Sequence, residues 1–380
     1  MSLVSPRIAV IGGGHLGRIH AKLLSASSEC TLVGVADPSS QSRAIVENDL
    51  KLATFEDYKS LEGQVDGVLV AAPTFLHHEI GSWALERGIH TFMEKPIAAT
   101  TDEAHRLVAL AHENQCTLQV GHVERFNPVW TTASSSWNRD SIRYIEAARE
   151  GTYTGRSTDI GIVMDLMIHD IDLILSLVQS PIESVRAYGW NVLGKHEDFA
   201  IAQLRFRNGT LAQLRASRIA EGPKRTMQVY SDEGVCHLDF AAGTVVKVDP
   251  HADVASGHRQ ADDLPADLRS KVKDQLFGEW LSKTEIKPAG VNAISLEHRE
   301  FLLAITTGQP VTVSGHAGAA AMSIAMEIVQ SIARGQPNQA IIPAADRFAA
   351  LGNFRNQITN NGLRRHYRPL VGMELVEVKN

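Results

Sequence analysis

Polar side chains interrupt an otherwise apolar helix that the sequence predicts over residues 162–178. Asp165, His169 and Asp172 stand at positions i, i+4 and i+7, which places them on one helix face. Because a buried carboxylate without a partner is costly, this stripe favours the wall of a cleft over a core position. A histidine beside a carboxylate can act as a general base at neutral pH. A solvated helix edge, or metal ligation by Asp165 and His169, is the alternative interpretation.

A second candidate for chemistry is Lys95, in the run Glu94-Lys95-Pro96 that follows a strand predicted over residues 89–93. In an open α/β sheet, ligands bind beyond the carboxyl ends of the strands. We therefore expect Lys95 near the reacting end of a bound cofactor, with Pro96 fixing the local backbone. An ordinary surface lysine before a helix is the alternative.

The run that would hold such a cofactor is Gly12-x-Gly14-x-x-Gly17, between a strand predicted over residues 7–11 and a helix over residues 16–25. In this pattern Gly12 permits a tight turn, Gly14 lets the backbone approach a pyrophosphate, and Gly17 lets helix and strand pack closely. The helix N-terminus then offers free N–H groups to the phosphates. A glycine turn in a domain that binds no dinucleotide is the alternative.

Asp37 directly follows the second predicted strand, residues 31–36, and lies 20 residues beyond Gly17. An acid at this place accepts hydrogen bonds from the adenosine ribose of NAD and repels the 2′-phosphate of NADP. Arg43 is close in sequence, so NADP is disfavoured without being excluded.

Two further runs lie where a ligand could touch them. Pro73 and Thr74 follow the strand predicted over residues 65–72, just before His77. His122 and Arg125 lie at the predicted junction of two domains, where clefts are common binding sites. Arg125 could bind a phosphate or carboxylate through two hydrogen bonds, or could form a salt bridge between the domains.

Strands and helices alternate through the first third of the chain. Further strands are predicted over residues 117–120 and a helix over 101–113, which indicates a doubly wound parallel sheet of the Rossmann type. We place this NAD-binding domain at residues 1–122.

From residue 123 the pattern changes to many short strands. They are predicted over residues 144–149, 184–188, 199–206, 210–216, 225–230, 235–240 and 244–248, with hairpin signals at residues 207–209 and 232–234. Helices are predicted over 293–306 and 315–334, and a polar loop over 256–267. The pattern predicts an α+β domain at residues 123–336 with a large, mostly antiparallel open sheet, followed by an extension over 337–380.

The composition limits the class of protein. Among 380 residues, 44% are hydrophobic and 21% charged, which is typical of globular chains, and the net charge of -6 argues against binding of nucleic acid or a membrane surface. The three cysteines are far apart and fit neither a disulfide framework nor a zinc site, so we expect a reducing compartment. We predict a cytoplasmic protein, since no signal peptide and no membrane-spanning run of ~18 apolar residues is evident.

The motifs taken in order resemble the glucose–fructose oxidoreductase / inositol dehydrogenase family. They are the glycine loop with Arg18 and His20, then Pro73-Thr74 with His77, then Glu94-Lys95-Pro96, then Gly161…Asp165…His169. The resemblance covers the chain to about residue 335. Residues 121–128 and 159–172 are most similar to the UDP-N-acetylglucosamine 3-dehydrogenase branch.

The resemblance implies an NAD-dependent enzyme that oxidises a secondary hydroxyl of a sugar, most simply C3 of UDP-N-acetylglucosamine. A free sugar or inositol as substrate, or a sensor that binds NAD without catalysis, stays open. The family resemblance also implies a homodimer or homotetramer that packs through the open sheet. Loop, motifs and resemblance together predict three sets of site residues and no metal. The catalytic set is Lys95, Asp165 and His169; the substrate set is His122, Arg125, Asp165 and His169; the cofactor set is Gly12, Gly14, His15, Leu16, Gly17, Asp37, Pro73, Thr74, His77, Glu94 and Lys95.

Overall fold

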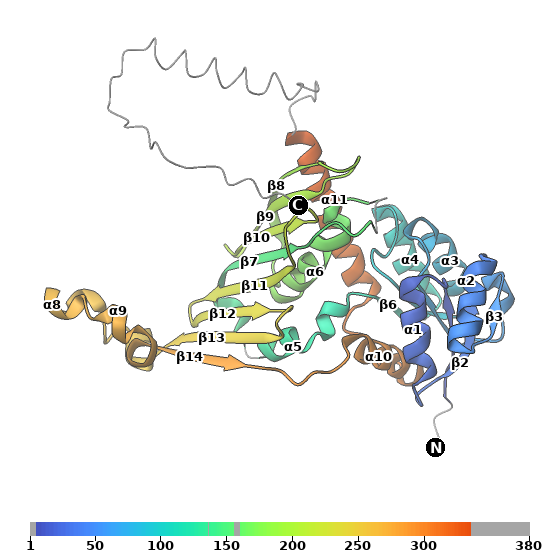
Figure 1. Cartoon of the computed structure of the whole chain (residues 1–380), viewed down its shortest axis with the longest axis horizontal. Coiled ribbons are helices and arrows are strands. Elements are labelled where there is room, and N and C mark those ends of the chain that lie inside the picture. Colours follow the sequence, from blue (N-terminus) through green and yellow to red (C-terminus); the bar gives the residue numbers. More distant parts are fainter. Residues whose placement is uncertain (1–4, 136, 156–159, 336–380) are drawn as a thin grey trace, which may run out of the picture. The chain divides into compact units, whose positions relative to one another are not determined.

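The computed structural model describes residues 5–135, 137–155 and 160–335 (Figure 1). Its first sheet has six strands in the order β3-β2-β1-β4-β5-β6, and every pair is parallel. The strands are β1 (Arg7–Ile11), β2 (Thr31–Ala36), β3 (Thr54–Phe55), β4 (Gly67–Val70), β5 (His90–Met93) and β6 (Leu118–Val120). This order is that of a dinucleotide-binding Rossmann sheet and confirms the predicted fold of the first part.

Helices connect these strands: α1 (His15–Ser25), α2 (Ser40–Ile45), α3 (His77–Leu85) and α4 (Thr101–Glu113). The start of α4 is fixed by a capping box, in which the Thr100 hydroxyl accepts from the Glu103 N–H and the Glu103 carboxylate accepts from the Thr100 N–H. The observed bounds of α4 confirm the helix predicted over 101–113.

The second sheet has eight strands in the order β14-β13-β12-β11-β7-β10-β9-β8. They are β7 (Ile142–Glu150), β8 (Ile182–Trp190), β9 (Phe199–Phe206), β10 (Leu211–Ser217), β11 (Lys224–Ser231), β12 (Gly234–Asp239), β13 (Thr244–Pro250) and β14 (Leu281–Ile286). All neighbours are antiparallel except β7 and β10, which are parallel. The mostly antiparallel sheet expected from the sequence is confirmed.

Side chains in this sheet alternate between a buried and an exposed face. The buried face packs beneath α6 (Ile168–Leu177) and α11 (Gly315–Gly335), and its core includes Ile145, Leu204, Leu214, Ile171, Ile174 and Ile328. α5 (Pro128–Ser134) covers the β12–β13 end through Trp130 and its neighbours. The other face carries exposed aromatic side chains, among them Tyr188 and Trp190.

Two parts of the second half differ from the sequence-based expectation. β14 was not predicted. The segment expected to be a loop, residues 256–267, contains the single turn η7 (Ala261–Asp263) and the start of the short helix α8 (Ala266–Arg269). Two further short helices flank it, α7 (Ala252–Ala255) before and α9 (Val272–Gln275) after. Figure 1 shows α8 and α9 beyond the ends of β13 and β14. The single helix expected over 162–178 begins as a π-helical turn, η6 (Val163–Met167), and continues as α6.

The helix α10 (Ala293–Thr307) packs against the first sheet, although it follows the second sheet in the sequence. Phe301 and Leu302 share a buried core with Ile8, Val10 and other residues of the first sheet. The Gln119 side chain also donates to the Glu297 carbonyl at 3.0 Å. The two sheets are therefore joined by this returning helix as well as by the direct connection near residue 122. No helix among the described residues is long and apolar enough to cross a membrane.

Candidate active site

The glycine loop lies between β1 and α1 and has the form that a pyrophosphate needs. Gly12 has φ +107°, and a Cβ there would lie 2.5 Å from the Ala71 carbonyl oxygen. A Cβ on Gly17 would lie 1.8 Å from the Gly12 oxygen, whereas one on Gly14 would meet nothing within 4 Å. Gly14, His15 and Leu16 are exposed at the start of α1. Gly12 and Gly17 thus shape the loop, and Gly14 leaves the helix N-terminus open to an anion.

Two alanine substitutions separate these roles. We expect Gly17→Ala to lower the free energy of unfolding by about 3 kcal/mol, because its methyl group overlaps the backbone of the loop. Gly14→Ala should leave that free energy unchanged and raise the Kd for NAD at least about tenfold, since the methyl group fills the space of the pyrophosphate. Urea unfolding and calorimetric titration with NAD measure the two effects. Normal NAD affinity in Gly14→Ala would place the pyrophosphate elsewhere.

Asp37 lies at the end of β2, on the wall of a cavity of about 500 Å³. Its two carboxylate oxygens accept from the N–H groups of Gly13, at 2.6 Å, and Ser39, at 2.8 Å. Glu56 and Asp57 line the same cavity, together with apolar side chains. Arg43 donates to the carbonyls of Asp37 and Pro38 and pairs with Glu56 at 3.5 Å. The acidic rim therefore disfavours a 2′-phosphate, and the nearby arginine is already engaged.

His77 holds two segments of the first sheet together. Its ring is buried, with Nδ1 2.8 Å from the Pro96 carbonyl oxygen and Nε2 2.9 Å from that of Ala72. Both nitrogens are engaged by backbone, so the direct cofactor contact expected of His77 is not available in this arrangement. Pro73, in contrast, is exposed and lines the cavity beside Asp37, and Thr74 begins the short turn that follows.

Glu94 is buried behind the site rather than exposed to it. Its carboxylate lies 2.9 Å from His20 Nε2, and the other ring nitrogen of His20 lies 2.7 Å from His298 Nε2. A Cβ on Gly121 would lie 2.8 Å from the Glu94 carboxylate, so a side chain there would force that carboxylate out of its contact with His20. Sequence reasoning did not point to His298, which lies on α10. This chain of contacts fixes the segment from which Lys95 projects.

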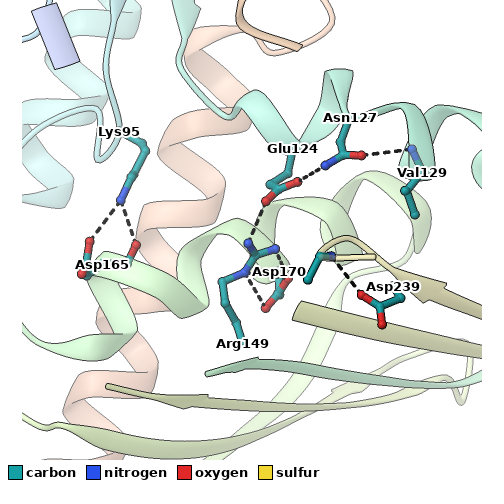
Figure 2. Close-up of polar contacts among 9 residues, drawn as sticks. Lys95, Glu124, Asn127, Val129, Arg149, Asp165, Asp170 and Asp239 are labelled. Atoms are coloured by element: carbon teal, nitrogen blue, oxygen red, sulfur yellow. Dashed lines mark hydrogen bonds and ion pairs between the residues drawn. The ribbon is translucent and has the colours of Figure 1, made fainter. Parts of the chain in front are cut away.

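Lys95 reaches across to the helix of the second sheet (Figure 2). Its Nζ donates to the Asp165 carbonyl oxygen at 2.8 Å and lies 3.4 Å from Asp165 Oδ1. Asp165 lies in the π-helical turn η6, and both side chains are largely but not fully buried. The structure thus brings together two of the residues that the sequence proposed for catalysis, from segments 70 positions apart.

His169 lies one turn further along and is held neutral. Burial, and then the charge of Lys95, lower the pKa of His169 well below its ordinary value. Its Nδ1 is buried and has no hydrogen-bond partner among the described residues. The ring stands edge-on to His122, with 6.5 Å between centroids, and burial lowers the pKa of His122 as well. The neutral imidazole has a free lone pair with which it can accept a proton, while the charge of Lys95 opposes the protonated form.

The other acids of this helix are paired rather than solvated. Asp172 is buried and accepts from Arg125 at 2.6 and 2.9 Å. The sequence placed it on one site-facing stripe with Asp165 and His169, but its carboxylate is taken up by this salt bridge. Of the two roles open to Arg125, the structure has the salt bridge. Arg149 pairs with Asp170 at 2.8 Å and Glu124 at 2.7 Å (Figure 2). These pairs fix the helix that carries His169.

The α10 helix adds one more buried acid, Glu297, which sequence reasoning did not find. Neither of its carboxylate oxygens has a hydrogen-bond partner in the described part of the chain. Burial, and then Glu94, raise the pKa of Glu297 well above its ordinary value. Burial therefore favours the protonated form of this acid. No cluster of three or more possible metal ligands occurs among the residues that the structure describes.

Comparison with known proteins finds oxidoreductases that are similar to this chain over most of its length. A family model described as an oxidoreductase family with an NAD-binding Rossmann fold matches residues 6–122, and a GFO/IDH/MocA C-terminal domain model matches residues 127–237. UDP-N-acetylglucosamine 3-dehydrogenase of Acidithiobacillus ferrooxidans is 32% identical over 326 residues, which cover 86% of this chain and 97% of that protein. Its crystal structure superposes with a TM-score of 0.75 at 30% identity, over the same shares of the two chains.

Two further proteins are similar over different lengths. The scyllo-inositol 2-dehydrogenase (NAD(+)) of Bacillus subtilis is 29% identical over 56% of this chain and 67% of its own. The WlbA dehydrogenase of Bordetella pertussis, solved with NADH and UDP-GlcNAcA, has the same fold, with a TM-score of 0.71 at 18% identity over 87% and 96% of the two chains. The chain belongs to the GFO/IDH/MocA family of oxidoreductases, with NAD as its cofactor.

Proposed function

We propose that this enzyme oxidises the C3 hydroxyl of UDP-N-acetylglucosamine to a ketone while NAD is reduced to NADH. The observation that carries the proposal is the similarity of this chain to an enzyme with that activity. The two are 32% identical over 97% of the length of that enzyme. The contact of Lys95 with Asp165 beside a neutral His169 supports it, because this set fits the oxidation of a hydroxyl group.

Each residue has a distinct part in the proposed reaction. His169 accepts the hydroxyl proton, which it can do because it is uncharged. Lys95 stabilises the negative charge that develops on the substrate oxygen, and Asp165 orients the lysine. Bound NAD supplies the acceptor for the hydride that leaves C3. The open space at Gly14 and the acidic rim at Asp37 fit the pyrophosphate and the adenosine ribose.

The direct test is turnover by the purified full chain with NAD. With UDP-N-acetylglucosamine we expect NADH to accumulate, seen by its absorbance, and mass spectrometry to find a product lighter by two hydrogens. Because tightly held NADH could hide turnover, a parallel reaction contains a 2-keto acid as acceptor. If only free sugars or inositols are turned over, the substrate is one of them and not UDP-N-acetylglucosamine. NAD binding without turnover on any of them would indicate a sensor.

We also infer that two or more copies associate through the exposed face of the second sheet. Tyr188 and Trp190 are at least half exposed there, Trp190 stacks near Phe199, and Tyr144 lies beside Tyr230. Exposed aromatic side chains on one sheet face are typical of protein interfaces. Sedimentation of the full chain tests this, since a monomer at micromolar concentration would contradict it.

The cellular compartment of the enzyme is proposed from its cysteines. Cys30, Cys116 and Cys236 are all free thiols, and Cys30 and Cys236 are buried. Unpaired cysteines are typical of a reducing environment, so we infer a cytoplasmic enzyme. A fractionation experiment that found the protein outside the cytoplasm would contradict this.

A further inference from the structure

One exposed arginine lies beside the catalytic helix and has no acidic partner among the residues that the structure describes. Arg225 is on β11, directly opposite Arg149 of the neighbouring strand β7. Side chains of directly paired residues point to the same face of a sheet, and on β11 that is also the face of the buried Met227. Arg225 is nevertheless exposed. The helices that pack on this face therefore do not cover its side chain.

The contacts of Arg149 locate Arg225 relative to the catalytic helix. Arg149 contacts Asp170, the residue next to His169, so Arg225 is one strand away from the catalytic helix. The charge of Arg225 acts on both His169 and Asp170. It contributes to the lowered pKa of His169, and it lowers the pKa of Asp170, which burial raises. An exposed cation thus stands at the edge of the proposed catalytic site.

The other arginines around this helix are engaged by acids. Arg125 pairs with Asp172, Arg149 with Asp170 and Glu124, and Arg218 with Asp198. For Arg225, no carboxylate within the described ranges lies at salt-bridge distance. A guanidinium that is exposed and uncommitted is available to a ligand, and it can donate two parallel hydrogen bonds to a phosphate.

We propose that Arg225 binds the diphosphate of the nucleotide-sugar substrate. The inference rests on the proposed function and extends it to the residue that selects this substrate class. In a UDP-sugar the diphosphate is attached to C1 of the same ring that presents C3 to His169, so it must lie close to the catalytic helix. Free sugars and inositols carry no such anion. Arg225 therefore favours nucleotide sugars over neutral polyols without touching the reacting carbon.

The test is Arg225→Gln, which removes the charge from an exposed side chain. We expect the KM for UDP-N-acetylglucosamine to rise about 10- to 100-fold while kcat and the KM for NAD change little. Arg225→Lys should recover part of the loss. Arg207→Gln is the matched control, since Arg207 is an exposed arginine in the β9–β10 turn, at the end of β9 away from Phe199 and Asp198. Unchanged KM in Arg225→Gln would overturn the inference.

Ligand binding separates this inference from the function on which it rests. Calorimetry of the NAD-loaded enzyme with UDP and with uridine should find UDP bound more tightly by wild type, and that preference lost in Arg225→Gln. A preference for UDP that persists in the variant places the diphosphate elsewhere and leaves the proposed substrate standing. If wild type binds neither UDP nor UDP-N-acetylglucosamine, the proposed function fails and the inference falls with it.

Discussion

His169→Asn is expected to lower kcat by about 10²–10⁴-fold while the Kd for NAD stays at its wild-type value. Asparagine keeps much of the ring's shape but cannot accept the hydroxyl proton. Lys95→Met should cause a loss of similar size, because the developing oxygen charge then has no cation beside it. Steady-state kinetics with UDP-N-acetylglucosamine and titration with NAD measure both effects.

The control for His169→Asn is His105→Asn, which changes an exposed histidine on α4. That variant should retain wild-type kinetics. Near-normal turnover in His169→Asn would assign the base to another group, and near-normal turnover in Lys95→Met would remove the lysine from the catalytic set. Loss of NAD binding in either variant would instead indicate damage to the cofactor site.

The pH dependence of the wild-type enzyme gives an independent check on His169. A general base works only when it is deprotonated, and the pKa of His169 lies well below 6.5. As pH falls through 6.5, the rate should therefore not decline through protonation of this histidine. A kcat/KM profile that titrates near 6.5 and loses this step in His169→Asn would contradict the buried, neutral state of the ring.

The parts of the fold predicted from sequence are those with local signals. Alternating strands and helices gave the parallel sheet, and the helix over 101–113 carries its own capping box. The glycine loop was recognised because each glycine answers a backbone constraint, as the contacts of Gly12 and Gly17 show. Lys95 and Asp165 were proposed from their motifs, and their contact follows from where the two elements meet.

The parts that sequence reasoning missed depend on contacts between distant segments. His298 meets His20 across 278 positions, and no local pattern marks a buried histidine on an amphipathic helix. The helical period placed Asp172 on the catalytic face, but periodicity does not reveal that Arg125 pairs with it. The π-helical turn at Val163–Met167 also departs from the assumed period. Sequence patterns therefore do not show which buried charged residues pair with one another.

That pairing predicts a large effect at a residue outside the reaction, Arg149. Its guanidinium, on β7, joins Asp170 of α6 to Glu124 of η4 (Val123–Phe126), and all three side chains are buried. Arg149→Met leaves two buried carboxylates without a cation. We expect the free energy of unfolding, measured by urea titration, to fall by about 3–5 kcal/mol.

The matched control is Arg143→Met on the same strand. Arg143 pairs with Asp232, and both side chains are more than half exposed, so this change should cost less than about 1 kcal/mol. Adding Asp170→Asn and Glu124→Gln to Arg149→Met should recover part of the stability, because it removes the stranded charges. Failure to recover any would attribute the loss to packing of the arginine stem instead.

The pH dependence of Arg149→Met distinguishes these causes further. Burial already raises the pKa of Asp170 with Arg149 present, and without the arginine that pKa must rise further. A carboxyl group whose pKa is higher in the folded protein than in the unfolded one destabilises the fold as pH rises above the unfolded value of about 4. The deficit relative to wild type should therefore be largest near neutral pH and shrink as pH falls toward 4. A deficit independent of pH would mean that charge plays no part, since packing losses do not titrate.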